Sequence, residues 1–176
     1  MRAFLGIPIP DGLREKIKNL EKEFEMKGVK TVKPENLHWT VKFFGDITEE
    51  EAEKIKKIMD GINFEPLEIS ISGIGVFPNI SYVKTIWIGA KEKEKFEKLL
   101  NEINKKFSEI RKETRKTTAH LTICRVKFLT DKEKLVNIIK KHENIEIGKM
   151  VVNSIVLYES KLTPDDPIYK KIKVIK

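Results

Sequence analysis

The chain has 176 residues, of which 40% are hydrophobic and 35% charged, and its formal net charge is +8. This length and composition indicate a soluble globular protein, made of one domain or of two small lobes that share a core, which needs no disulfide or metal to fold. The single cysteine, Cys124, excludes an intramolecular disulfide and a zinc site of several cysteines, and no apolar run approaches the roughly 18 residues of a membrane span, so we expect a cytoplasmic protein without a membrane anchor.

The excess of basic over acidic residues has two interpretations. It favours polyanionic partners, nucleic acid among them. The charged residues are mostly Lys and Glu, however, and Ile is frequent, which is typical of hyperthermophile proteins. Composition alone leaves both interpretations open.

The first predicted elements are a strand, a helix and a second strand. Residues 2–9 read as a strand that prolines stop, and residues 11–27 carry apolar side chains at helical spacing, with Gly28 as the expected C-cap. A turn over 34–36 then leads into an apolar strand over 37–44. This order already mixes strands and helices.

The middle of the chain continues the mixture. Thr48 is expected to cap a helix, with Glu51 three residues later completing a capping box. Apolar residues at period two predict strands over 64–75 and 83–90, and a helical stripe follows over 91–107. The two strands follow one another directly, as in a hairpin.

The last third repeats this alternation. We expect a strand over 119–128, a helix over 130–142, one or two strands over 145–158 and a closing strand over 168–175. Several strands again follow each other without a helix between them. The pattern favours an α+β fold with antiparallel sheets over a doubly wound parallel sheet.

Two of the three histidines stand two residues before a threonine on an apolar strand. His38 and Thr40 lie in LHWTVKFF, and His120 and Thr122 lie in AHLTICR. With ten threonines in the chain, this coincidence arises by chance about one time in a hundred. The repeated spacing therefore indicates two related lobes.

Strand geometry gives the spacing a physical meaning. Residues i and i+2 of a strand point to the same side, about 6.6 Å apart. His38 thus shares a face with Thr40, and His120 with Thr122, while the residues between them face helices. If the two strands are neighbours in space, two imidazoles and two hydroxyls meet in one cleft.

That set of side chains suits phosphate-ester chemistry. An imidazole can act as base or acid near neutral pH, and hydroxyls can donate to the non-bridging oxygens of a phosphate. Either motif alone is more often a buried histidine beside a threonine, but the pair favours a shared site. A metal site with His38 and His120 as ligands lacks a third histidine or carboxylate at usable spacing, so we expect no metal and no cofactor.

The paired motifs resemble the 2H phosphoesterase superfamily, and within it the RNA 2′,3′-cyclic phosphodiesterases, also called the 2′-5′ RNA ligase family. The similarity runs over nearly the whole chain. It is carried by the segments RAFLGIPIP, NLHWTVKFFGDI, VKTIWIGA, HLTICR and LYESKLTPDDPIYKKIKV. The sequence departs from the family pattern in the lead-in to the second motif, TTAH in place of Phe-x-Pro-His, and in the closing turn over 164–167.

The resemblance implies a two-lobed α+β fold with a pseudo-twofold axis, in which antiparallel sheets flanked by helices enclose a positively charged central cleft. Residues 1–176 would form a single domain of two interleaved lobes. The implied reaction is hydrolysis of a 2′,3′-cyclic phosphate at an RNA end to a 2′-phosphomonoester, and 2′-5′ joining of RNA is also associated with the family. The expected partners are RNA ends or small cyclic-phosphate nucleotides, bound by a monomer.

The resemblance also assigns roles. His38 and His120 become the general acid-base pair, and Thr40 and Thr122 become phosphate ligands. Arg125 becomes a further phosphate or oxyanion ligand. Because Arg125 follows His120 by five residues, a regular strand would turn it to the opposite face, so it must reach around or follow a bend.

Two more substrate contacts are predicted from alternation in the first motif strand. Lys42 and Phe44 are expected to share the His38 face, where Lys42 could touch phosphate. Phe44 could stack on a base there, although a phenylalanine in this position is more often simply a core residue. The basic segment over 111–116 either guides an RNA backbone or is a solvated loop.

Two questions stay open at this level. A non-catalytic RNA-binding protein that keeps the cleft is the alternative function. The sequence also does not distinguish which histidine is the base and which the acid.

Overall fold

The computed structural model describes residues 1–113 and 115–176; Thr114, in the middle of the basic segment, lies outside the described residues. Strands in this part of the chain form two antiparallel sheets. The first sheet has the order β3-β1-β8-β9. Its strands are β1 (Arg2–Pro8), β3 (His38–Asp46), β8 (Ile155–Lys161) and β9 (Ile168–Ile175).

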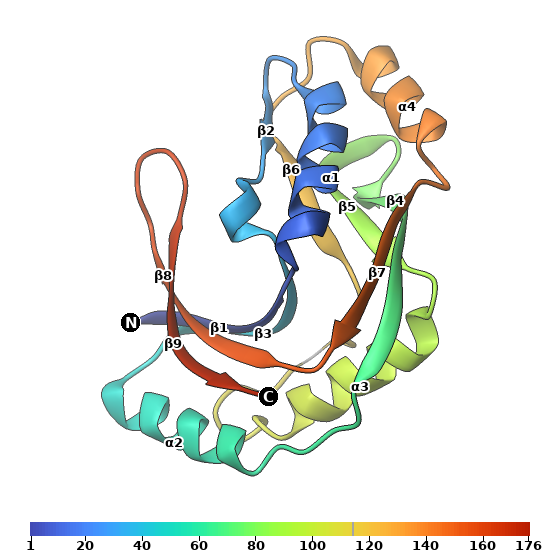
Figure 1. Cartoon of the computed structure of the whole chain (residues 1–176). Helices are drawn as coiled ribbons and strands as arrows, with labels where there is room; N and C mark the ends of the chain where they lie inside the picture. Colours follow the sequence, from blue (N-terminus) through green and yellow to red (C-terminus); the bar gives the residue numbers. More distant parts are fainter. Residues whose placement is uncertain (114) are drawn as a thin grey trace.

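The second sheet has the order β2-β6-β5-β4-β7. Its strands are β2 (Val29–Thr31), β4 (Leu67–Asn79), β5 (Tyr82–Ala90), β6 (Leu121–Val126) and β7 (Glu146–Val152). The two sheets curve toward each other, and the hairpin of β8 and β9 rises beside the short helix that precedes β3 (Figure 1). Each sheet thus takes strands from both halves of the chain.

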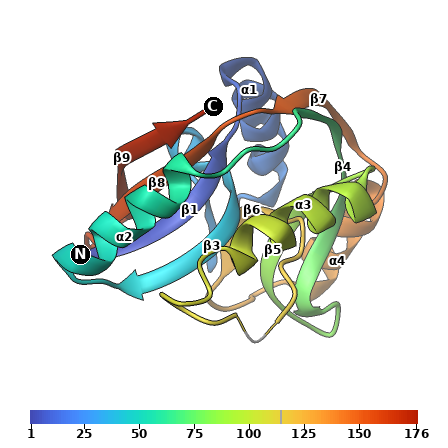
Figure 2. The same cartoon turned by 90° about the horizontal axis from the view of Figure 1, so that it is seen from below.

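Helices cover the outer faces of the sheets. They are α1 (Asp11–Glu21), α2 (Glu49–Asp60), α3 (Lys93–Lys105) and α4 (Lys132–Lys141), with the 3-10 helices η1 (Lys22–Phe24) and η2 (Pro34–Asn36). Viewed from below, α2 runs along the first sheet and α3 lies across β3 and β5 (Figure 2). No helix in the described part of the chain is both long and apolar enough to cross a membrane.

The expected α+β architecture with antiparallel sheets is confirmed. Thr48 and Glu51 form the predicted capping box through two hydrogen bonds of 3.1 Å. The predicted first helix is shorter than expected, because it tightens into η1 after Glu21. The three-residue strand β2 was not predicted, since so short a segment carries no period-two signal.

Packing confirms the alternation around both motifs. Trp39 and Val41 on β3 are 0% and 1% exposed, and Leu121 and Ile123 on β6 are both fully buried. These four side chains belong to one continuous apolar core. The motif strands are therefore anchored through the residues that alternate with the His-Thr pairs.

Each motif strand also contains a β-bulge directly after its threonine. On β3, Thr40 pairs with Gly6 and Lys42 pairs with Leu5, so Val41 is an extra residue. On β6, the partners Thr122–Trp87 and Cys124–Ile86 leave Ile123 as the extra residue in the same way. Beyond a bulge, the side chains that would have faced one side of the strand face the other. The two bulges therefore determine which side chains after each threonine point into the cleft.

Candidate active site

Both motifs face the space between the two sheets, where two adjoining cavities lie. The first, here called the His38 cavity, has a volume of about 360 Å³ and contains His38, Thr40, Thr122 and Arg125 in its wall. The second, the His120 cavity, has a volume of about 570 Å³ and contains His120 and Thr40. The structure therefore places both predicted pairs and Arg125 at adjoining cavities that share Thr40, with Thr122 in the wall of the His38 cavity and its partner His120 in the wall of the other.

The His38 ring is held at both nitrogens. Its Nδ1 lies 2.7 Å from the carbonyl oxygen of Asn36, and its Nε2 lies 2.9 Å from Oγ1 of Thr40. A carbonyl oxygen only accepts, so Nδ1 carries the proton in the neutral ring and Nε2 accepts from the threonine hydroxyl. Phe4 and Tyr169 pack against the ring, with centroid distances of 4.7 and 5.4 Å.

The His120 ring is held in a closely similar way, although it lies just before β6 begins. Its Nδ1 lies 3.0 Å from the carbonyl oxygen of Thr118 and 3.0 Å from the hydroxyl of the same residue. Phe77 packs edge-on at 5.1 Å, beside Trp87. In both motifs the carbonyl two residues upstream therefore fixes the ring, which leaves Nε2 as the nitrogen with the lone pair in the neutral ring.

The pKa values of both histidines are lowered. The pKa of His38 is lowered to about 4, chiefly by burial; the hydrogen bond to Asn36 opposes this shift, and the charges of Arg125 and His120 add to it. Burial also lowers the pKa of His120, where the Thr118 carbonyl and the nearby carboxylate of Glu97 act in the opposite direction. The effect of His120 on the pKa of His38 agrees with the placement of the two rings near each other.

Cationic side chains surround the His38 cavity. Lys30, Lys33 and Lys127 line it with Arg125. Lys30 and Lys33 pair with Asp166 at 3.2 and 3.3 Å, so the β8–β9 hairpin tip closes one side of the cavity. The site has the positive charge that an anionic ligand requires.

The bulges correct two expectations and explain a third. Phe44 does not share the His38 face: it is 3% exposed and packs against Phe107 at 5.6 Å. Phe43 reaches the cleft in its place, is 48% exposed and lines both cavities. The matching bulge on β6 returns Arg125 to the face of Thr122, where the regular alternation would have turned it away.

Lys42 also lies differently from the expectation. It does not share the His38 face; its side chain is buried, with Nζ 2.9 Å from Oδ1 of Asn104 on α3. It touches the edge of the His120 cavity rather than the His38 cavity. The physical reason is again the bulge at Val41, which turns the next side chain toward the helix.

The aromatic residues beside His38 were missed as site residues. Phe43 stands next to the predicted Phe44, and only the bulge distinguishes them. Tyr169 carried a signal, because it lies in the closing segment that supports the family resemblance.

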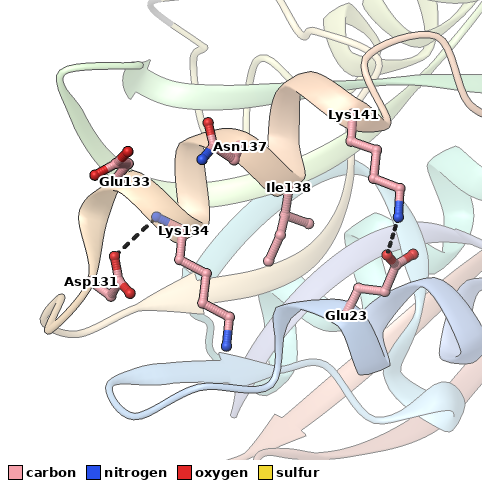
Figure 3. Close-up of a pocket in the computed structure, with 7 residues that line it drawn as sticks. All are labelled: Glu23, Asp131, Glu133, Lys134, Asn137, Ile138 and Lys141. Carbon is pink, nitrogen blue, oxygen red and sulfur yellow. Dashed lines mark hydrogen bonds and ion pairs between the residues drawn. The ribbon is translucent and has the colours of Figure 1, made fainter.

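Another hollow lies on the outside of the molecule, between η1 and α4 (Figure 3). Glu23 and Lys141 pair across it at 3.4 Å, and the third histidine, His142, lies 2.7 Å from the same glutamate. This hollow contains neither motif.

Within the two described segments, no three His, Cys, Asp or Glu side chains are grouped as a metal site would require.

Known proteins resemble this chain in sequence and in fold. A family model described as LigT like Phosphoesterase matches the chain twice in succession, over residues 7–87 and 88–169. Each match contains one His-Thr pair, which supports the interpretation of the two motifs as related lobes.

Curated relatives are similar over almost their full length. The chain is 43% identical to the RNA 2′,3′-cyclic phosphodiesterase of Methanocaldococcus jannaschii, covering 98% of this chain and 99% of that protein. It is 36% identical to the protein of the same name from Archaeoglobus fulgidus, covering 99% of each.

Solved structures share the fold at lower identity. A Thermus thermophilus protein superposes with a TM-score of 0.82 at 22% identity, covering 99% of this chain and 96% of that one. E. coli LigT complexed with 3′-AMP superposes with a TM-score of 0.78 at 19% identity and the same coverage.

Proposed function

This chain belongs to the LigT like Phosphoesterase family, and on that premise we propose that it is an RNA 2′,3′-cyclic phosphodiesterase which opens the terminal cyclic phosphate to a 2′-phosphomonoester. The observation that carries the proposal is the matched pair of imidazoles. Each is fixed through Nδ1 by a carbonyl two residues upstream, and both stand at cavities that share Thr40.

The reaction needs one base and one acid on opposite sides of phosphorus. A water molecule attacks phosphorus and loses a proton to the Nε2 of one neutral ring. The bond from phosphorus to the 3′ oxygen breaks, and that oxygen takes a proton from Nε2 of the other, protonated ring. In 2′-5′ joining, the 5′ hydroxyl of a second RNA would replace water as the nucleophile: it would attack phosphorus and lose its proton to the base, while the bond from phosphorus to the 3′ oxygen breaks and that oxygen takes a proton from the acid.

Thr40, Thr122 and Arg125 are proposed to hold the phosphate. Thr40 donates to His38 at 2.9 Å in the free protein and can transfer this hydrogen bond to a non-bridging oxygen, which releases Nε2 for proton transfer. The Arg125 charge would stabilise the negative charge that develops on the phosphate oxygens. The low pKa of His38 keeps that ring neutral at pH 7 in the free protein.

The decisive assay is release of a 2′-phosphate from an RNA that ends in a 2′,3′-cyclic phosphate, measured with EDTA present. Each of the variants His38→Ala and His120→Ala is expected to lower kcat by about 10² to 10⁴-fold. Full activity of the double variant would overturn the proposal. Tight RNA binding without turnover, unchanged in the double variant, would instead favour a binding protein.

A second substrate distinguishes the acid from the base. Replacing the 3′ oxygen of the cyclic phosphate by sulfur gives a leaving group that departs without a proton. The histidine variant that regains activity on this substrate lacks the general acid, and the variant that stays inactive lacks the base.

A further inference from the structure

Helix α3 carries a row of polar side chains toward the segment that precedes His120. Glu97, Asn101 and Asn104 stand four and three residues apart, so they lie on one face of the helix. Asn104 is only 3% exposed, although the neighbouring buried positions of this helix are apolar. Burying an amide costs free energy unless its hydrogen bonds are made, so the side chain of Asn104 is expected to have hydrogen-bond partners.

The row binds three backbone groups, on two residues of the chain just upstream of His120. The backbone of Thr117 donates to Oδ1 of Asn101 at 2.8 Å, and its carbonyl accepts from Nδ2 of Asn101 at 3.3 Å. The backbone N–H of Ala119 donates to Glu97 at 2.7 Å. Between these two points lies Thr118, whose carbonyl fixes Nδ1 of His120.

Asn104 connects the same segment to the other motif strand. Its Nδ2 donates to the hydroxyl of Thr117 at 3.1 Å and to the carbonyl of Val41 at 2.9 Å, and its Oδ1 accepts from Lys42 at 2.9 Å. Val41 follows His38 by three residues, and Thr117 precedes His120 by three. One buried side chain thus joins both histidine-bearing segments, and all its polar hydrogens and its oxygen are engaged.

We propose that Glu97, Asn101 and Asn104 are positioning residues that set the His120 ring relative to His38, and that Glu97 also supports the protonated form of His120. This inference rests on the proposed function. It gives Lys42 a different role from the predicted phosphate contact, since the lysine fixes the amide of Asn104. A displacement of about 1 Å at a reacting group can cost on the order of 100-fold in rate.

The electrostatic part follows from the groups around His120. Arg125 on β6 faces His120 with a positive charge, and His38 on β3 would do so when protonated. Glu97 is the carboxylate whose charge raises the pKa of His120. The other charged side chains that line the His120 cavity are Lys42, Glu113, Arg115 and Lys116. Removing the Glu97 charge should therefore lower the pKa of His120 and leave that of His38 nearly unchanged.

Two pairs of variants separate position from charge. Glu97→Gln keeps an acceptor for the Ala119 N–H and removes the charge, whereas Glu97→Ala removes both. Asn101→Leu and Asn104→Leu remove the hydrogen bonds without changing charge. Glu102→Gln, at an exposed position of the same helix, is the matched control for loss of a carboxylate.

The measurements are kcat and KM on an RNA with a cyclic phosphate end, and an NMR titration of the His120 ring in the uncomplexed protein. We expect Glu97→Ala, Asn101→Leu and Asn104→Leu to lower kcat by about 10- to 100-fold with KM within about threefold of the parent. Glu97→Gln should retain most of kcat but move the His120 titration to lower pH. Glu102→Gln should change neither quantity.

Parental kcat in folded Glu97→Ala and Asn101→Leu variants would overturn the positioning role. Both residues are partly exposed, so these two variants test that role even if the Asn104→Leu variant does not fold. An unchanged His120 titration in Glu97→Gln would overturn the electrostatic role. If the parent protein does not turn over the RNA, the proposed function fails, but the titration still tests the electrostatic role.

Discussion

Replacing Phe43 or Phe44 by alanine gives two adjacent variants with opposite expected effects. The β-bulge at Val41 leaves Phe43 48% exposed at the boundary of both cavities and Phe44 3% exposed in the core. The Phe43→Ala variant should therefore lose substrate affinity, and the Phe44→Ala variant should lose stability.

The magnitudes follow from these environments. Stacking of a base on an aromatic ring contributes about 1–3 kcal/mol, so Phe43→Ala should raise KM by roughly 5- to 150-fold. Truncating a buried phenylalanine costs about 3–5 kcal/mol, so Phe44→Ala should lower Tm by roughly 6–20 °C. Phe43 stacks on Phe4 at a centroid distance of 6.1 Å, so its own removal should lower Tm by only a few degrees.

The assay combines thermal unfolding with steady-state kinetics on an RNA that ends in a 2′,3′-cyclic phosphate, at a temperature where both variants are folded. Phe44→Ala should keep a parental KM per folded molecule. A raised KM in Phe44→Ala with a parental KM in Phe43→Ala would show that the regular alternation, and not the bulge, describes this strand.

Two further predictions concern charge and burial. Arg125→Met should raise the pKa of both His38 and His120, because the Arg125 charge lowers both, and should raise KM; NMR titrations that do not move would contradict this. Glu21→Gln should flatten the pH dependence of stability. Burial raises the pKa of Glu21 from its usual 4.5 to about 8, so the folded state keeps a proton that the unfolded chain releases. The stability from this proton is fully present below about pH 4.5 and is lost as the pH rises to about 8. The gain in Tm from Glu21→Gln should therefore be larger at pH 8 than at pH 5, and parallel melting profiles of the two proteins across this range would refute the argument.

Local patterns in the sequence were sufficient to predict much of the secondary structure and the fold class. Apolar spacing identified the four α-helices that the structure describes in residues 1–113 and 115–176, and the capping box at Thr48 followed from residues three apart. Strands without intervening helices indicated antiparallel sheets, because a hairpin needs only a short turn. What spacing did not supply was the order of strands, since β1 lies between β3 and β8, which are more than a hundred residues apart in the chain.

The same division applies to the candidate site. The spacing of His38 with Thr40 and of His120 with Thr122 could be interpreted from sequence, because side chains two apart share a face of any regular strand. That rule fails at the first bulge, and a bulge depends on how a strand pairs with its neighbours.

Only the tertiary structure decided which residues beyond each threonine reach the cleft. It selected Phe43 over Phe44, turned Lys42 toward Asn104 and returned Arg125 to the site. The physical reason is that one extra residue in a ladder reverses the alternation beyond it, and its place is fixed by contacts between distant segments rather than by the residues themselves.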